Sequence, residues 1–130
     1  MMKKKILIIE DNEQNMYMLT YLLESNNYQV IKAFTGVEGI RVASESFPDA
    51  ILLDIQLPEM DGYTVARNLR SIRELDSAPI IAVTSYAMVG DREKVMDSGA
   101  DGYIEKPIDP DTFIQQMETI LVEKRNSQHD

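Results

Sequence analysis

Short apolar runs recur along this chain, and most of them do not alternate polar with apolar residues. They are Ile6–Ile9, Ala50–Leu53, Ile80–Val83 and, more weakly, Tyr28–Phe34, with a shorter fifth at Gly102–Ile104. A strand without alternation is covered on both faces, which is typical of a parallel sheet flanked by helices. The runs therefore predict a sheet of five buried strands.

Between these runs the apolar residues follow a helical spacing, which predicts one amphipathic helix after each strand. The apolar residues that mark these helices are Met16, Leu19, Leu22 and Leu23, then Val37, Ile40, Ala43 and Phe47, then Val65, Leu69 and Ile72, then Val95 and Met96, and finally Phe113, Ile114, Met117, Ile120 and Leu121.

Capping signals agree with this division into helices. Thr35 and Glu38 have the spacing of a capping box, and Asp109 precedes Pro110 as an N-cap precedes a first-turn proline. Gly99 is placed to end the fourth helix. The alternation predicts one α/β domain over residues 1–124, a doubly wound, five-stranded parallel sheet with five helices, and a flexible tail over 125–130.

The residues that follow the predicted strands carry the chemistry. Glu10 and Asp11 follow the first strand, Asp54 the third, Thr84 ends the fourth, and Lys106 follows the fifth. Functional sites of doubly wound folds lie at the carboxyl ends of the strands. We therefore expect three carboxylates, a hydroxyl and an ammonium on one rim.

Any one of these residues alone is more often a turn former, a helix cap or a solvated charge than a functional group. As a set they indicate a site, because three neighbouring carboxylates raise one another's pKa unless a cation relieves them. Mg²⁺ suits such oxygen ligands. An aspartate beside a cation and a lysine is well placed to attack a phosphoryl group and form an aspartyl phosphate.

The motifs resemble those of the receiver domains of bacterial two-component response regulators, over nearly the whole chain from Lys3 to about Glu123. They are ILIIEDN at 6–12, DIQLPEMDG at 54–62, AVTS at 82–85 and Lys106-Pro107. The resemblance implies the flavodoxin-like strand order 2-1-3-4-5. It also implies Asp54 as phosphoacceptor and Mg²⁺, replaceable by Mn²⁺, held by Glu10 through water, by Asp11 and Asp54 directly, and by the backbone carbonyl of Gln56.

The same resemblance assigns the remaining residues of the site. Thr84 would hydrogen-bond the phosphoryl group, Lys106 would pair with it, and Tyr103 would be the aromatic switch whose rotamer changes. The Lys106–Pro107 bond would be cis. A binding surface formed by the fourth helix, fifth strand and fifth helix, roughly residues 87–121, would then switch.

Two further positions are expected to set the lifetime of the phosphate. In this fold the side chains two places after the phosphoacceptor and after the hydroxyl residue shield or orient the attacking water; here they are Gln56 and Tyr86. Neither is a general base, whose help is typically worth about 10²–10⁴-fold. We expect hydrolysis over minutes or longer.

Composition limits the classes of partner that this chain can bind. Thirteen basic against twenty-two acidic residues give a net charge of −9, which disfavours nucleic-acid binding. There is no cysteine and no apolar run long enough to span a membrane. We expect a cytoplasmic protein that is not an enzyme beyond its own phosphorylation and dephosphorylation. Its partners would be a histidine kinase or phosphotransfer protein and a downstream target.

Several other readings are weaker. The acidic loop at 10–13 would repel a flavin phosphate, and Gln56 stands where a haloacid-dehalogenase-type phosphatase needs a second acid. No Gly-x-Gly-x-x-Gly follows a strand, as a dinucleotide enzyme would require. Within the receiver family, the sequence is closest to stand-alone regulators of the cell-cycle or chemotaxis type. A phosphorelay intermediate or the receiver of a hybrid histidine kinase stays open.

Overall fold

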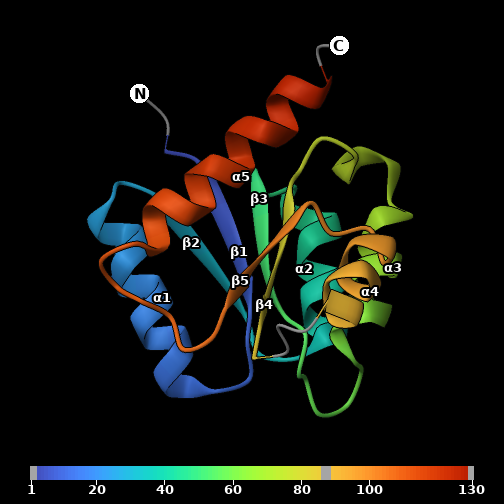
Figure 1. Cartoon of the computed structure of the whole chain (residues 1–130), viewed down its shortest axis with the longest axis horizontal. Coiled ribbons are helices and arrows are strands. Elements are labelled where there is room, and N and C mark those ends of the chain that lie inside the picture. The colour runs from blue at the N-terminus through green and yellow to red at the C-terminus, as the bar shows by residue number, and fades with distance from the viewer. Residues whose placement is uncertain (1–2, 86–88, 129–130) are drawn as a thin grey trace.

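A computed structural model describes residues 3–85 and 89–128. Five parallel strands form one sheet in the order β2-β1-β3-β4-β5, which confirms the predicted flavodoxin-like topology (Figure 1). The strands are β1 (Lys5–Ile9), β2 (Gln29–Ala33), β3 (Ala50–Asp54), β4 (Ile80–Thr84) and β5 (Gly102–Glu105).

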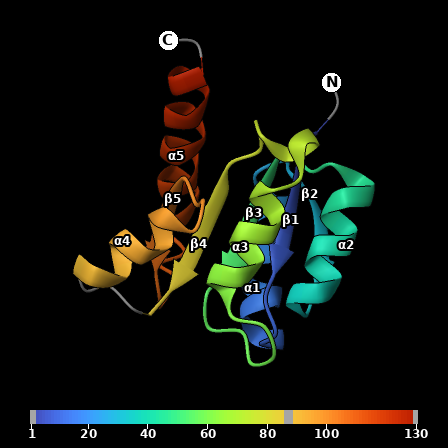
Figure 2. The ribbon, with the colours of Figure 1, turned by 90° about the vertical axis from the view of Figure 1, so that its right-hand side faces the viewer.

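One helix follows each strand, and the helices cover both faces of the sheet. They are α1 (Glu13–Ser25), α2 (Gly36–Ser46), α3 (Gly62–Arg70), α4 (Val89–Asp97) and α5 (Phe113–Gln128), with a short 3₁₀ turn, η1 (Arg73–Leu75), before β4. Helices α1 and α5 share one apolar core with the sheet, while α2, α3 and α4 share the other. Figure 1 shows α1 and α5 to the left of the sheet and α2, α3 and α4 to its right, and Figure 2 views the molecule from that right-hand side.

Two of the three predicted caps form. Thr35 accepts a hydrogen bond from the Glu38 N–H at the start of α2, and the Glu38 carboxylate accepts one from the Phe34 N–H. The prediction of Asp109 as the N-cap of the fifth helix is wrong, because Asp109 accepts from the Asp111 N–H in a turn and α5 begins only at Phe113. Gly99 ends α4 with a φ of +112°, a conformation that favours glycine.

The expected core face of α2 is wrong at two of its four positions. Val37 and Phe47 are 62% and 49% exposed, and Phe47 is the left-handed residue that ends the helix. The buried positions are instead Gly36, Gly39 and Ala43. Apolar periodicity could not reveal this face, because glycine has no side chain to mark it.

The glycine face lets α2 approach the sheet closely, and this gives a stability prediction. A methyl group on Gly39 would overlap the Ile9 side chain, whereas one on Gly90 in α4 would meet nothing within 4 Å. We expect Gly39→Ala to lower the free energy of unfolding by about 2 kcal/mol, as overpacking does. Gly90→Ala should raise it by up to about 0.5 kcal/mol, because alanine favours helix. Urea unfolding of both variants tests the contrast; equal effects would contradict it.

Helix α5 continues to Gln128, so the prediction of a flexible tail from residue 125 is wrong for residues 125–128. The helix is tied near this end by Lys124, whose Nζ lies 3.0 Å from Asp101 Oδ1. An ion pair between a helix and a distant turn cannot be recognised from local sequence patterns.

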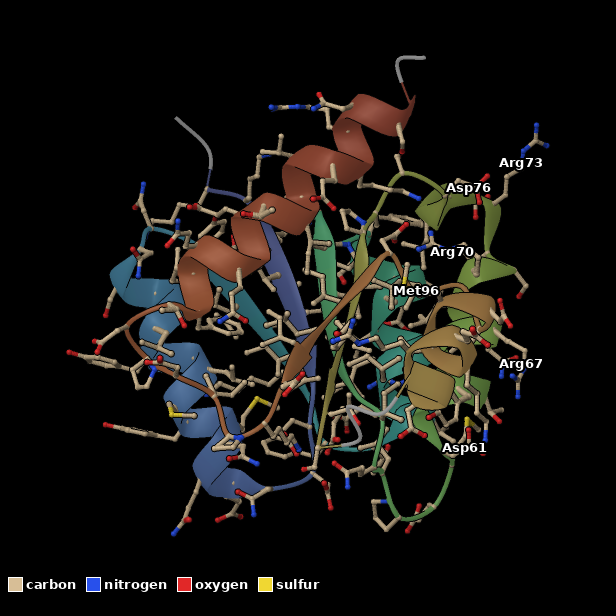
Figure 3. The ribbon with its side chains drawn as sticks, viewed as in Figure 1. Asp61, Arg67, Arg70, Arg73, Asp76 and Met96 are labelled. Atoms are coloured by element: carbon tan, nitrogen blue, oxygen red, sulfur yellow. The ribbon has the colours of Figure 1, made fainter. Side chains whose placement is uncertain are left out.

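Asp101 also belongs to a partly buried network centred on Arg70. The Arg70 guanidinium lies 2.7 Å from Asp101 Oδ2 and donates to backbone carbonyls of Gly99, Leu75, Asp76 and Ala78. Asp101 Oδ2 additionally accepts from the Ile80 N–H. Figure 3 shows Arg70 turned inward, while Arg67 and Arg73 point away from the molecule. The network joins α3, the turn before β5 and, through Lys124, α5.

No helix within the described ranges is both long and apolar enough to cross a bilayer.

Candidate functional site

The candidate site lies at the carboxyl ends of the strands, the lower end of the sheet in Figure 1. Ile9 of β1 is level with Leu53 of β3, so Glu10 follows one strand beside Asp54 on the next. Asp54 is level with Val83, which places Thr84 one residue further along β4. Parallel pairing therefore brings residues from distant parts of the chain to one rim, as predicted.

Three carboxylates converge there. Oxygen atoms of Glu10, Asp11 and Asp54 all lie within 4.8 Å of one another. Glu10 and Asp54 are only 1% and 3% exposed, whereas Asp11 is exposed. Glu10, Asp11 and Asp54 together form a cluster that we call the acidic cup. Asp11 is its solvent-accessible member.

Lys106 supplies the positive charge opposite these acids. Its Nζ lies 3.2 Å from Asp54 Oδ1 and 3.4 Å from Glu10 Oε1. The side chain is 17% exposed, so most of it is shielded from water. The peptide bond from Lys106 to Pro107 is cis, as the resemblance implied.

Lys106 does not fully offset the cost of placing carboxylates so close together. Burial, together with the neighbouring Asp54, raises the pKa of Glu10 to about 7. Its Oε1 has no hydrogen-bond partner among the described residues, while Oε2 accepts from the Asn12 N–H at 3.1 Å. Three carboxylates with oxygen atoms this close together, two of them buried, fit a hard divalent cation. The cluster could therefore bind a metal.

Backbone groups hold the other site residues in place. Asp54 Oδ1 accepts a hydrogen bond of 2.9 Å from the Gln56 N–H. Thr84 is fully buried, and its carbonyl accepts from the Lys106 N–H at 2.8 Å. The first contact orients the Asp54 carboxylate. The second connects the ends of β4 and β5.

Tyr103 is the position expected to control switching, and Gln56 is one of the two expected to control lifetime. Tyr103 on β5 is half-buried, and the Arg92 guanidinium lies 4.9 Å from its ring centre. The Gln56 side-chain oxygen accepts a hydrogen bond of 3.0 Å from the Ser85 N–H. Tyr86 lies outside the described residues.

Two contacts at the site were not predicted. Asn12 both caps α1, by accepting from the Asn15 N–H, and donates its own N–H to Glu10. Asn is a preferred N-cap, and Asn12 directly precedes the apolar helical pattern of α1, so this cap could have been recognised from the sequence. The hydrogen bond between Gln56 and Ser85 joins segments that are distant in the sequence, so it could not be recognised from local patterns.

Comparison with known proteins identifies the class to which this fold and site belong. The family model of the response regulator receiver domain matches residues 6–118. The chain belongs to this family and is a module of two-component signalling.

Individual relatives agree. The chain is 42% identical over 120 residues to the polar-differentiation response regulators DivK of Brucella ovis and Brucella suis, covering 92% of this chain and 98% of those proteins. It is 32% identical to the receiver domain of a sensor histidine kinase from Pseudomonas aeruginosa, whose structure has a magnesium ion in the active site cleft. That match has a TM-score of 0.84 and covers 92% of this chain and 98% of that one. The chemotaxis protein CheY4 of Vibrio cholerae shares the fold, with a TM-score of 0.89 at 24% identity, over 92% of this chain and 100% of that one.

Proposed function

We propose that Asp54 is the phosphoacceptor of a receiver switched by a partner histidine kinase or phosphotransfer protein. The observation that carries the proposal is the position of Lys106 Nζ, 3.2 Å from Asp54 Oδ1, next to two further carboxylates. An ammonium there can pair with a phosphoryl oxygen once the group is attached to Asp54. Burial of Asp54 excludes most competing water.

A divalent cation completes the site in this proposal. Glu10, Asp11 and Asp54 would hold Mg²⁺, or Mn²⁺ in its place, with the backbone carbonyl of Gln56 as a further ligand. The cation supplies positive charge that offsets the repulsion between the carboxylates and an incoming phosphate. The convergence of the three carboxylates, with oxygen atoms all within 4.8 Å of one another, supports a cation at this place.

The transfer requires little of the protein beyond positioning. An oxygen of the Asp54 carboxylate forms a bond to phosphorus while the bond from phosphorus to the donor breaks, and the donor nitrogen or oxygen keeps that electron pair. The Gln56 N–H orients the Asp54 carboxylate through its bond to Oδ1. Lys106 and the Thr84 hydroxyl would bind the transferred group. The chain would catalyse only this transfer and its own slow dephosphorylation.

The test is phosphorylation by acetyl phosphate. We expect the chain to gain one acid-labile phosphoryl group only with Mg²⁺ or Mn²⁺ present, as measured by intact-protein mass spectrometry. Asp11→Asn should require much more metal for the same labelling, because it removes the accessible carboxylate of the cluster. Equal labelling in excess chelator would contradict the proposed cation.

Phosphorylation would be transmitted through Thr84 and Tyr103. A phosphoryl group adds about −1.5 to −2 charges near neutral pH, and movement of Thr84 toward it would open space behind β4 for the Tyr103 ring. Leaving its outward position would separate that ring from Arg92. The switched surface would be formed by α4, β5 and α5, with a downstream protein as its partner.

Beryllofluoride, a phosphoryl mimic, tests this transmission. In NMR spectra we expect the Tyr103 ring signals and the backbone signals of α4 and β5 to shift when beryllofluoride and Mg²⁺ are added. Tyr103→Phe keeps the ring and should preserve the shifts of α4, whereas Tyr103→Ala should reduce them. Shifts confined to the loops around Asp11 and Asp54 would contradict a switch at Tyr103.

A role as a phosphorelay intermediate or as the receiver of a hybrid kinase is the second candidate. The 32% identity to the receiver domain of a sensor histidine kinase favours keeping it. The site chemistry would be the same in both cases. A target that binds only the phosphorylated chain would support the switch, and rapid return of the phosphate to a phosphotransfer protein would support the relay.

A further inference from the structure

The amino end of the sheet, opposite the acidic cup, differs in charge from the rest of the chain. Two hollows adjoin there, and Tyr28 and Asp49 line both of them. Their lining has three acidic residues against five basic ones, which are Lys3, Lys4, Lys5, Lys124 and Arg125. Basic side chains therefore outnumber acidic ones at this end, whereas the whole chain has thirteen basic and twenty-two acidic residues.

One of these hollows has the size of a ligand site. Its volume is about 480 Å³, within the range of about 300–1,000 Å³ that is typical of small-molecule sites. Helix α5, which extends beyond the sheet in Figure 2, forms one wall, and the amino ends of β1 and β3 lie at the base. None of its described lining residues belongs to α4 or β5. The hollow therefore differs from the surface that phosphorylation would switch, although α5 borders both.

Much of the lining of this hollow is apolar. Ile6, Ala50 and Pro79 are buried residues at its base, and Leu121 and Val122 line it from α5. Val122 is 42% exposed, so an apolar group in the hollow would cover surface that now faces water. Removing such surface from water is favourable.

Tyr28 adds an aromatic side chain whose position is fixed. Its hydroxyl donates a hydrogen bond of 2.6 Å to Glu118 Oε2. Burial, together with this carboxylate, raises the pKa of Tyr28 above its usual value, so the hydroxyl keeps its proton at neutral pH. Tyr28 therefore lines the hollow without adding charge.

Two cations of the lining have no ion pair within the part of the chain that the structure describes. Lys4 and Arg125 are both exposed, and neither lies in a salt bridge there. Lys124 also lines the hollow, but its Nζ already lies 3.0 Å from Asp101 Oδ1. Lys4 and Arg125 are therefore the charges available to a ligand.

The two carboxylates of the hollow are engaged by other groups. Asp49 Oδ2 accepts a hydrogen bond of 2.7 Å from the Lys5 N–H, and Glu118 accepts the bond from Tyr28. Neither acid forms a salt bridge among the described residues. A group that pairs with the two available cations must therefore come from outside the chain and carry negative charge.

We infer that this hollow is a second binding site, which takes a small organic anion with an apolar body and one carboxylate, phosphate or sulfonate group. Lys4 and Arg125 pair with the acidic group, and the apolar lining covers the body. The concave shape favours a small molecule, because a site of this size encloses most of such a ligand. The inference does not rest on the proposed function, since the hollow and the acidic cup lie at opposite ends of the sheet.

Two dyes that share one ring system test the site. Anilinonaphthalene sulfonate carries one sulfonate, and phenylnaphthylamine is its uncharged counterpart. Each is titrated into the full chain; fluorescence gives the affinity, and NMR locates the dye. We expect one sulfonate dye per chain, with shifts at Tyr28, Leu121 and Val122. The uncharged dye should bind about fivefold more weakly, a loss typical of two contacts between exposed charges. Added salt should weaken only the sulfonate dye, because salt screens exposed charges.

The decisive variant is Lys4→Gln combined with Arg125→Gln. We expect it to bind the sulfonate dye about fivefold more weakly than the parent chain and the uncharged dye equally well. The control is Lys32→Gln combined with Arg67→Gln, which changes the net charge by the same amount. Lys32 and Arg67 are exposed and do not line the hollow, and Figure 3 shows Arg67 directed away from the molecule. The control should bind both dyes as the parent chain does.

Three results would overturn the inference: equal affinity for the two dyes, equal weakening in the two double variants, or dye shifts located elsewhere on the surface. A peptide of alternating glutamate and serine tests for a protein ligand. If this peptide shifts the same signals at lower concentration than the sulfonate dye, the surface binds an acidic protein segment and the inference is wrong. Shifts at the hollow that depend on chain concentration without any dye would indicate a second copy of the chain and would also contradict it.

Discussion

Asp54→Asn is expected to reduce labelling by acetyl phosphate to background. The amide lacks a nucleophilic carboxylate oxygen, yet its own oxygen can still accept the hydrogen bond that the Gln56 N–H gives to Oδ1. The variant should therefore fold, and its circular dichroism spectrum should match that of the parent chain. The loss would then belong to the chemistry and not to the structure.

Asp97→Asn is the matched control for this experiment. Asp97 is an exposed residue at the end of α4, and its replacement should leave labelling unchanged. Mass spectrometry of both proteins, with peptide mapping after borohydride reduction, locates the phosphorylated residue. Persistent Mg²⁺-dependent labelling of the Asp54→Asn chain would assign the phosphoacceptor elsewhere.

Arg70→Met should lower the free energy of unfolding substantially. The substitution removes an ion pair of 2.7 Å with Asp101 and the hydrogen bonds that the guanidinium donates to carbonyls of Gly99, Leu75, Asp76 and Ala78. Removing one partner of a largely buried pair typically costs about 3 kcal/mol. Lys124 remains to compensate part of the charge on Asp101.

Urea unfolding measures this loss, with Arg73→Met as the control. Arg73 is exposed, and Figure 3 shows its side chain directed away from the molecule. Its replacement should change the free energy of unfolding by less than about 0.5 kcal/mol, as surface substitutions do. Similar midpoints for the two variants would mean that the Arg70 network contributes little.

The strand order and the residues of the rim could be predicted because both depend on short-range signals. Apolar runs without alternation indicate parallel strands, and parallel strands bring the residues after them to one edge. Glu10, Asp11, Asp54 and Lys106 therefore converge as expected. The motif resemblance added the family, which the family comparison confirms.

What could not be predicted depends on contacts between distant segments. The α2 face is built on Gly36 and Gly39, which apolar periodicity does not register. Most hydrogen bonds of the Arg70 network go to backbone carbonyls. Every residue has a carbonyl, so the sequence does not indicate which of them lie near Arg70. The hydrogen bond from the Ser85 N–H to the Gln56 side chain also joins segments that are far apart in the sequence.

The start of β1 and the end of α5 lie at the end of the molecule opposite the candidate site (Figure 1). A fluorescent protein, an affinity tag or a linker to a sensor surface attached at either terminus would therefore sit far from the acidic cup. An immobilised chain would present its phosphorylation rim to the solution, so kinase docking could be measured on a chip without steric interference from the support.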